Sequence, residues 1–219
     1  MRRPARRPSG IYREKTYWQH SGDPMTDLSR KAFDTLLTEA KAVYDATPAL
    51  QNFAAWPTDL EFAPHAPQHI PALRQIMLWD NDHPLHTATQ AIVPYGNWIQ
   101  TYTEDDVGYG FLQDYGYIEL YGPTGHFTSH QGRAYIAYWG KGLYYPWHHH
   151  EAEELYAVIS GSGYFEAEGQ DPKTLASGDC QFHKSNQPHA LTMKDSAILT
   201  LILWRGAGMT GLPKMGSNA

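Results

Sequence analysis

A run of histidines and carboxylates in the second half of the chain has the residue types of a metal site. Three consecutive histidines, residues 148–150, are followed within six residues by three glutamates and a tyrosine. Imidazole nitrogens and carboxylate oxygens bind divalent transition metals, and these donor types alone do not choose among Zn, Fe, Mn, Ni and Co. The run therefore predicts a site for one divalent metal ion of undecided identity.

The geometry of an extended strand separates the members of this run. Side chains two residues apart point to the same face of a strand. His148 and His150 therefore share a face, and Glu154 and Tyr156 can face the same interior after the turn between them. The residues of the other parity, which we expect on the solvent or packing side, are His149, Glu151 and Glu153. His148, His150 and Glu154 are the local ligand candidates.

A fourth ligand is expected from a distant strand, because local residues alone cannot surround an ion. Pro188-His189, which follows Gly178 by eleven residues at the histidine, supplies it. His183 also lies close to the predicted site, where we expect a packed or hydrogen-bonded role for it.

Tyr156 is a candidate base beside this metal site. It follows Glu154 by two residues, so the two side chains share a strand face. A phenol has an ordinary pKa near 10, and a nearby dication favours the phenolate form, which is a strong base in a dry site. A core tyrosine with a satisfied hydroxyl is the alternative.

Aromatic residues are dense just before the ligand run. They are Tyr135, Tyr138, Trp139, Tyr144, Tyr145 and Trp147. Aromatic faces attract cationic, methylated ligands, although the same residues also suit ordinary core packing. The basic residues of this region, Arg133, Lys141 and Lys184, are isolated, which disfavours phosphorylated sugars as substrates.

These residues lie in a part of the chain that is patterned as short strands. From about residue 108, runs of β-branched and aromatic residues alternate with Gly, Pro, Asp and Asn, which is typical of a β-sandwich or β-barrel. The expected strands are Tyr117–Tyr121, Arg133–Trp139, Glu154–Ser160, Tyr164–Glu168, Cys180–His183, Ala190–Met193 and Ile198–Trp204.

Helical periodicity characterises the part of the chain before the strands. It predicts a helix from residue 26 or 27 to about residues 46–48, an irregular connection over 49–68, and helices over Pro71–Leu78 and His86–Val93. The predicted organisation is a loosely ordered basic tail (1–25), a helical extension (26–107), a β-barrel (108–209) and a C-terminal tail (210–219).

Charge and composition exclude several classes of protein. Residues 1–24 carry six basic and two acidic residues within a chain of net charge −6, so the remaining body is strongly acidic and unsuited to nucleic acid. A single cysteine excludes an internal disulfide, and no run of 18 apolar residues predicts a membrane span. We expect a cytoplasmic protein; the oligomeric state is not predicted.

The spacing of the ligand candidates resembles the two signature motifs of the cupin superfamily. Gly142, His148, His150, Glu154 and Gly161 match the first motif at its defining positions. The second motif is partial, with Gly178 and His189 in place but Ala176 where a proline is usual. The resemblance covers about residues 115–205. It implies a small jelly-roll barrel whose metal site has three histidines and one glutamate.

A closer resemblance covers about residues 27–209. The segment Tyr145–Tyr156, with Phe182-His183, Pro188–Ala190 and Leu203–Gly208, is similar to the cupin-type dimethylsulfoniopropionate lyases, above all their DddQ branch. The resemblance implies that His148, His150, Glu154 and His189 bind the metal and that Tyr156 is the general base. It also implies a site role for Tyr145. The candidates for holding the substrate's sulfonium are Trp139, Tyr144, Tyr145 and Trp147.

The function that this resemblance implies is cleavage of a small onium carboxylate. The metal would bind the carboxylate, Tyr156 would take the α-proton, and dimethyl sulfide would leave acrylate behind. Loops from the helical part, with the aromatic segment from Tyr95 to Tyr109 as the candidate, would exclude water. Two other functions remain open at this point, a metal-dependent cupin dioxygenase and a non-catalytic cupin that binds a small ligand.

Overall fold

The structure, a computed structural model, describes residues 27–216. The basic tail predicted for residues 1–25 and the last three residues, 217–219, lie outside the described residues. Within residues 27–216, no helix combines the length and the apolar character that crossing a membrane requires.

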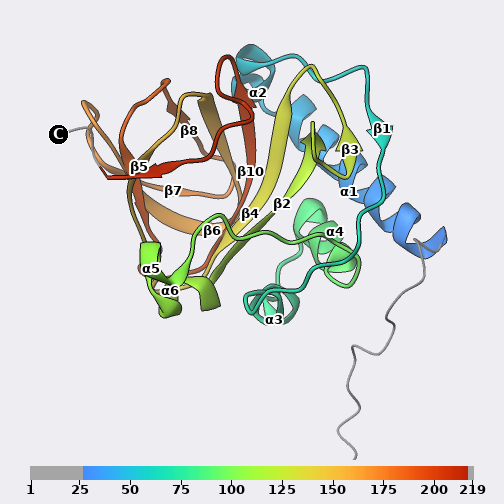
Figure 1. Ribbon diagram of the computed structural model, residues 1–219, viewed down its shortest axis with the longest axis horizontal. Coiled ribbons are helices and arrows are strands. Elements are labelled where there is room, and N and C mark those ends of the chain that lie inside the picture. The colour runs from blue at the N-terminus through green and yellow to red at the C-terminus, as the bar shows by residue number, and fades with distance from the viewer. Residues whose placement is uncertain (1–26, 217–219) are drawn as a thin grey trace, which may run out of the picture.

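The helices within residues 27–92 lie along one side of a large sheet, whereas the two short helices within residues 104–113 lie apart from them (Figure 1). α1 (Asp27–Ala46) begins where the periodicity predicts a helix, and it buries Phe33, Leu36 and Ala40 on one face. It packs against α4 (Pro84–Ile92). The other helices are α2 (Pro48–Phe53), α3 (Leu73–Leu78), α5 (Glu104–Val107) and α6 (Tyr109–Gln113).

The segment predicted as an irregular connection is partly structured. It contains most of the short helix α2 and the two-residue strand β1. Pro48 is the first residue of α2, a position that suits proline because the first helical N–H has no partner within the helix. Pro48, which the sequence places at the end of the first predicted helix, therefore also begins α2.

The strands form one hydrogen-bonded sheet. They are β1 (Glu61–Phe62), β2 (Tyr115–Gly122), β3 (Phe127–Thr128), β4 (Arg133–Trp139), β5 (Tyr144–His149), β6 (Glu153–Ala167), β7 (Lys173–Ala176), β8 (Cys180–His183), β9 (His189–Thr192), β10 (Ile198–Arg205) and β11 (Lys214–Met215). Their order is β1-β3-β2-β4-β10-β6-β9-β5-β11, and β7 and β8 also pair with β6. The fold is mainly β, as predicted, but the ladder of hydrogen bonds does not close into the complete barrel that the cupin resemblance implies.

β6 joins the two halves of this curved sheet. Its first part pairs with β8 and β10, and its second part pairs with β7 and β9. The sequence predicts two separate strands here, and that prediction is wrong: the chain bends at Gly161 and continues. Gly161 has φ +75°, and a Cβ at this position would lie 1.8 Å from the carbonyl oxygen of Ala197, so a side chain does not fit.

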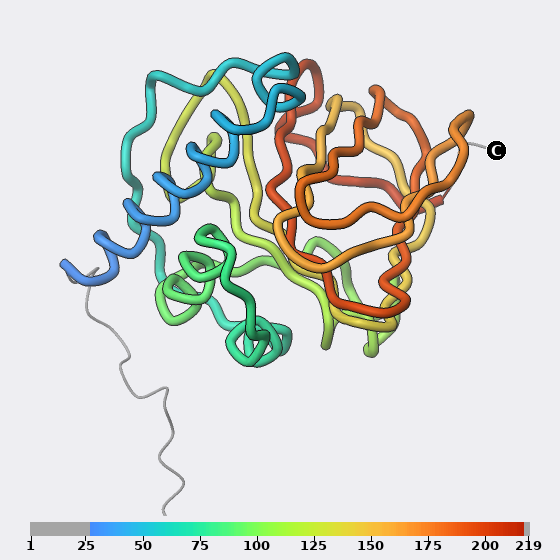
Figure 2. Tube along the Cα trace, turned by 180° about the vertical axis from the view of Figure 1, so that it is seen from behind, coloured from blue at the N-terminus to red at the C-terminus, as the bar shows by residue number. Residues whose placement is uncertain are grey.

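Alternation along the central strands gives the sheet two different faces. On β4, Ile136 packs in a core shared with the helices, whereas Tyr135 and Trp139 belong to an aromatic core inside the curved sheet. On β6, Leu155 faces the helices and Tyr156 faces the interior. Figure 2 shows that α1 (blue) and the strands of the last third of the chain (orange to red) lie on opposite sides of the molecule.

The segment after residue 209, predicted as a tail, is ordered through residue 216. β11 pairs antiparallel with β5, so that Lys214 lies opposite His149 and Met215 lies opposite His148. After β10 the chain therefore returns to β5, the strand that carries His148.

Candidate active site

Three buried histidines, His148, His150 and His189, lie close together inside the curved sheet. His148 on β5 lies directly opposite His189 on β9, and their ring centroids are 4.0 Å apart. Each of the three rings has its Nδ1 at a backbone carbonyl oxygen two residues away: His148 at Pro146 (2.8 Å), His150 at Ala152 (2.9 Å) and His189 at Gln187 (2.8 Å). A carbonyl oxygen only accepts, so each Nδ1–H donates. These bonds orient the rings and leave Nε2 as the coordinating atom.

Glu154 is the carboxylate beside these histidines, and both of its oxygens are engaged. Trp204 Nε1 donates to Oε1 over 2.8 Å. Around Oε2 lie His150 Nε2 at 3.2 Å, His183 Nδ1 at 3.0 Å and His189 Nε2 at 3.4 Å. Burial would raise the pKa of Glu154, but the charge of His150 and the surrounding hydrogen bonds hold this pKa well below its usual range. The side chain is an anion.

The donor set fits a divalent transition metal. One ligand atom each from His150, Glu154 and His189 lie within 4.8 Å of one another, and all three residues are buried. His189 Nε2 is buried and has no hydrogen-bond partner within the described residues, which an ion would supply. Burial, with the neighbouring His189, holds the pKa of His148 well below its usual value, so this ring is neutral as a ligand must be. Three of the four predicted ligands, His150, Glu154 and His189, thus lie together; His148 is outside this group, although its ring contacts that of His189 with centroids 4.0 Å apart.

His183 contacts this cluster more closely than the sequence indicates. Besides its contact with Glu154, its ring stacks on His189 with centroids 3.9 Å apart at 17°. It also meets the edge of Tyr156 at 5.5 Å. It lies at the end of β8, directly opposite Glu154 on β6, which brings its Nδ1 to the carboxylate.

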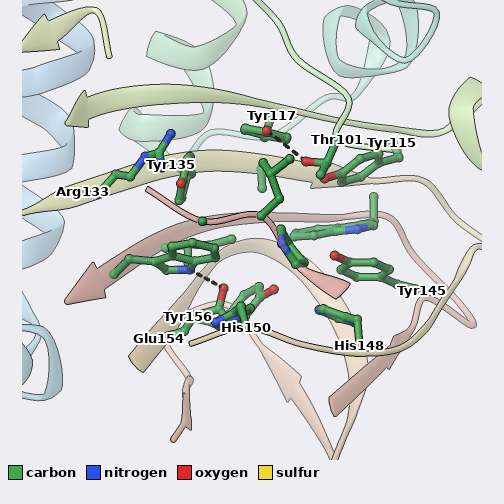
Figure 3. Close-up of a pocket in the computed structure, with 17 residues that line it drawn as sticks. Thr101, Tyr115, Tyr117, Arg133, Tyr135, Tyr145, His148, His150, Glu154 and Tyr156 are labelled. Atoms are coloured by element: carbon green, nitrogen blue, oxygen red, sulfur yellow. Dashed lines mark hydrogen bonds and ion pairs between the residues drawn. The ribbon is translucent and has the colours of Figure 1, made fainter. Parts of the chain in front are cut away.

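Tyr156 lies beside His150 and Glu154 in the close-up of the cavity (Figure 3). It is buried, and its ring meets the edge of Phe165 at 5.7 Å. Burial and then the charge of Glu154 raise the pKa of Tyr156 well above its usual value. Without a compensating cation it is therefore a neutral phenol.

Tyr145 lines the same cavity and stacks on His148, with ring centroids 3.8 Å apart at 22°. Its hydroxyl hydrogen-bonds with that of Tyr102 over 2.5 Å. Tyr102 and the cavity residue Thr101 come from the segment Tyr95–Tyr109, which thus packs at the site, as its predicted role in excluding water requires.

The cavity extends from His148, His150 and Glu154 along the aromatic core inside the curved sheet. The empty space of this cavity, counted together with the open solvent at its mouth, is about 500 Å³. Trp139 lines it, whereas Tyr144 and Trp147 are not among its lining residues, and Tyr144 is 46% exposed. The aromatic rings that the sequence reading missed are Tyr115, Tyr117 and Trp204. The structure therefore gives no support to Tyr144 and Trp147 as substrate contacts.

The residues predicted to face solvent, His149, Glu151 and Glu153, point away from the candidate ligands. Glu151 is exposed, and Glu153 pairs with Arg205 at 2.8 Å outside the cavity. His149 is partly exposed and its Nδ1 contacts the carbonyl oxygen of Gly216 at 3.2 Å. Arg133, read from the sequence as isolated, lines the cavity instead.

Comparison with known proteins shows the family of the chain. The family model described as dimethylsulfoniopropionate lyase matches residues 68–200. The dimethylsulfoniopropionate lyase DddQ of Ruegeria pomeroyi is 36% identical over 183 residues, which cover 80% of this chain and 90% of that protein.

Two crystal structures are similar over most of the chain. One, from a study of the lyases RdDddP and RnDddQII, is 39% identical with a TM-score of 0.82, covering 86% of this chain and 99% of that one. The other, DddQ from Ruegeria pomeroyi, is 33% identical with a TM-score of 0.81, covering 89% and 100%. The chain belongs to the dimethylsulfoniopropionate lyase family.

Proposed function

We propose that this protein cleaves dimethylsulfoniopropionate into dimethyl sulfide and acrylate by a metal-dependent β-elimination, with Tyr156 as the general base. One observation carries the proposal within this family. A buried tyrosine shares a single cavity with three predicted metal ligands, His148, His150 and Glu154.

The two ends of the cavity suit the two charged ends of the substrate. His148, His150, Glu154 and His189 would hold a divalent metal ion, which supplies positive charge for binding the carboxylate and for acidifying the adjacent C–H bond. At the other end, aromatic faces attract the sulfonium by cation–π interaction. Tyr117 and Tyr135 line the cavity there (Figure 3), whereas Trp204 and Trp139 line it next to Glu154 and Tyr156.

Tyr156 then moves the proton. As a phenolate, its oxygen takes the proton from the carbon next to the carboxylate, and that C–H electron pair forms the new C=C bond. The C–S bond breaks with its electrons passing to sulfur, which leaves as neutral dimethyl sulfide. Because burial and Glu154 both raise the pKa of Tyr156 in the metal-free site, the phenolate requires a positive neighbour. The activity should therefore depend strictly on the metal.

The surrounding residues keep the site dry and ordered. Tyr145 is held between His148 and the hydroxyl of Tyr102, so the ring beside the first ligand has a fixed position. Thr101 Oγ1 donates to the hydroxyl of Tyr117 over 2.9 Å, which ties the preceding segment to the wall of the cavity. A dry site strengthens every charge interaction that the elimination uses.

Release of dimethyl sulfide tests the proposal. Purified protein is loaded separately with Fe, Mn, Ni, Co or Zn, its metal content is measured, and it is incubated with dimethylsulfoniopropionate. We expect dimethyl sulfide in the headspace and an equal amount of acrylate in solution with at least one metal, and neither product after chelation. Absence of both products from fully metallated samples would contradict the proposal, and substrate-dependent oxygen consumption would favour a dioxygenase.

A further inference from the structure

The last described segment of the chain forms one wall of the cavity. Gly211, Leu212 and Pro213 line it, between the end of β10 and the short strand β11. On the metal side this segment is tied by β11, whose Met215 pairs with His148. The wall has a fixed position only if the other end of the segment, near Met209, is also held by a contact.

Arg133 ties that other end. Its Nη1 donates to the carbonyl oxygen of Met209 over 2.5 Å, and its Nη2 donates to Glu119 over 2.7 Å. The side chain is 13% exposed and lines the cavity, with its guanidinium carbon 5.1 Å from the ring centroid of Tyr135. Figure 3 shows Arg133 and Tyr135 together, on the opposite side of the cavity from His148.

Glu119 makes this arrangement electrostatically neutral. Its side chain is 2% exposed, and Thr124 donates to it from the hydroxyl (2.6 Å) and from the backbone N–H (3.2 Å). A Cβ on Gly122, which has φ +148°, would lie 2.2 Å from Glu119 Oε1, so a glycine leaves the carboxylate its place. A lone guanidinium beside the cavity would repel a cationic ligand, and the buried carboxylate offsets that charge.

We propose that Arg133 is a positioning residue that fixes the segment Met209–Pro213 as a wall of the cavity, and that Glu119 cancels its charge so that the cavity accepts a cation. The part of this proposal that concerns substrate rests on the proposed function. The anchoring part does not, and it can be measured without activity.

Arg133→Met removes the anchor while keeping an unbranched side chain of similar length. Amide hydrogen exchange over residues 211–216 should accelerate, because Gly211 and Gly216 are hydrogen-bonded within this segment and to β5. KM for dimethylsulfoniopropionate should rise about tenfold, a factor expected for losing a buried hydrogen bond to a charged group, while kcat changes little. Arg133→Lys keeps the charge but cannot reach both partners as a fork, so it should restore KM partly.

Glu119→Gln tests the charge separately from the shape. The amide can still accept from Arg133, but the guanidinium is no longer neutralised. Binding of dimethylsulfoniopropionate should weaken severalfold more than binding of 4-methylpentanoate, which has the same shape with an uncharged carbon in place of sulfur. Equal weakening of the two ligands would overturn the role given to Glu119.

Arg205→Met is the matched control. Arg205 also pairs with a glutamate, Glu153, and with a backbone carbonyl, that of Phe53, but it lies outside the cavity. This variant should leave the exchange of residues 211–216 and KM unchanged.

Two results would overturn the proposal. Unchanged exchange over residues 211–216 in both Arg133 variants would show that Arg133 is not the anchor. Accelerated exchange with unchanged affinity for both ligands would show that the segment is no functional wall. If the wild type released no dimethyl sulfide, the proposed function would fail, while exchange and 4-methylpentanoate binding would still decide the role of Arg133.

Discussion

Replacing His183 tests whether a residue outside the four predicted ligands sets the affinity of the metal site. His183 is 1% exposed, its Nδ1 lies 3.0 Å from Glu154 Oε2, and its ring stacks on His189. Because Glu154 is an anion and only accepts, His183 Nδ1–H is the donor of this bond. His183→Phe keeps a flat ring for the stack and removes the donor.

The magnitude follows from what the bond does to Glu154. A buried hydrogen bond to a charged group contributes about 1.5–3 kcal/mol. Loss of a partner that orients a metal ligand costs about 10–100-fold in metal affinity, which corresponds to about 1.4–2.8 kcal/mol. The two ranges agree, so we expect the dissociation constant for the metal to rise by about one to two orders of magnitude.

Competition with a chromophoric chelator measures this change on the metal-free protein. His126→Phe is the matched control, since His126 is also 1% exposed and stacks on an aromatic ring, Phe33, among the helices. It should lower the stability of the fold and leave metal affinity unchanged. A folded His183→Phe variant with wild-type metal affinity would refute the reasoning.

Two further predictions concern an exposed aromatic residue and the pH dependence of stability. Tyr144→Ala should leave KM and kcat within about twofold of the wild type, because this side chain is 46% exposed and does not line the cavity; steady-state kinetics would show a larger loss if Tyr144 held the sulfonium. Burial and then the neighbouring His65 lower the pKa of His126 to about 3, so the unfolded chain binds a proton near pH 6.5 that the folded chain refuses. The free energy of unfolding that neutral His126 contributes is fully present above pH 6.5. It declines as the pH falls from there toward 3, by about 2 kcal/mol between pH 7 and 5. Urea unfolding of the wild type and of His126→Phe measures it, and the same pH slope in both proteins would contradict the assignment.

Strand periodicity predicts correctly which residues of β6 face the cavity. Side chains that alternate along β6 place Glu154 and Tyr156 on the inner face and Leu155 on the outer one. Three residues, His150, Glu151 and Ala152, separate β5 from β6, and the glycine at position 161 bends β6 without ending it. The sequence could not distinguish that bend from a turn, because glycine with positive φ serves both.

Parity does not indicate the inward-facing residues where a strand is irregular. The pairing of β5 with β9 shifts register between Tyr145 and His148, so these two residues both face inward although they are three apart. Trp147, which an undisturbed strand would place on the same face as Tyr145, does not line the cavity. A register shift leaves no signal in the composition of a strand.

The walls of the cavity depend on contacts between segments that are distant along the chain. Arg133 reaches Met209 across 76 residues, and Tyr102 reaches Tyr145 across 43. No local pattern predicts such pairs, because only the folded sheet brings them together. Arg133 therefore reads as isolated in the sequence.

The most direct test of the account compares Tyr156→Phe with the wild type. The phenylalanine keeps the ring among Trp139, Phe165 and His183 and removes only the hydroxyl. We predict full metal content by elemental analysis, and release of dimethyl sulfide slowed by about 10²–10⁴-fold, the usual contribution of a general base. A fully metallated Tyr156→Phe protein that releases dimethyl sulfide at the wild-type rate would show that Tyr156 is not the base.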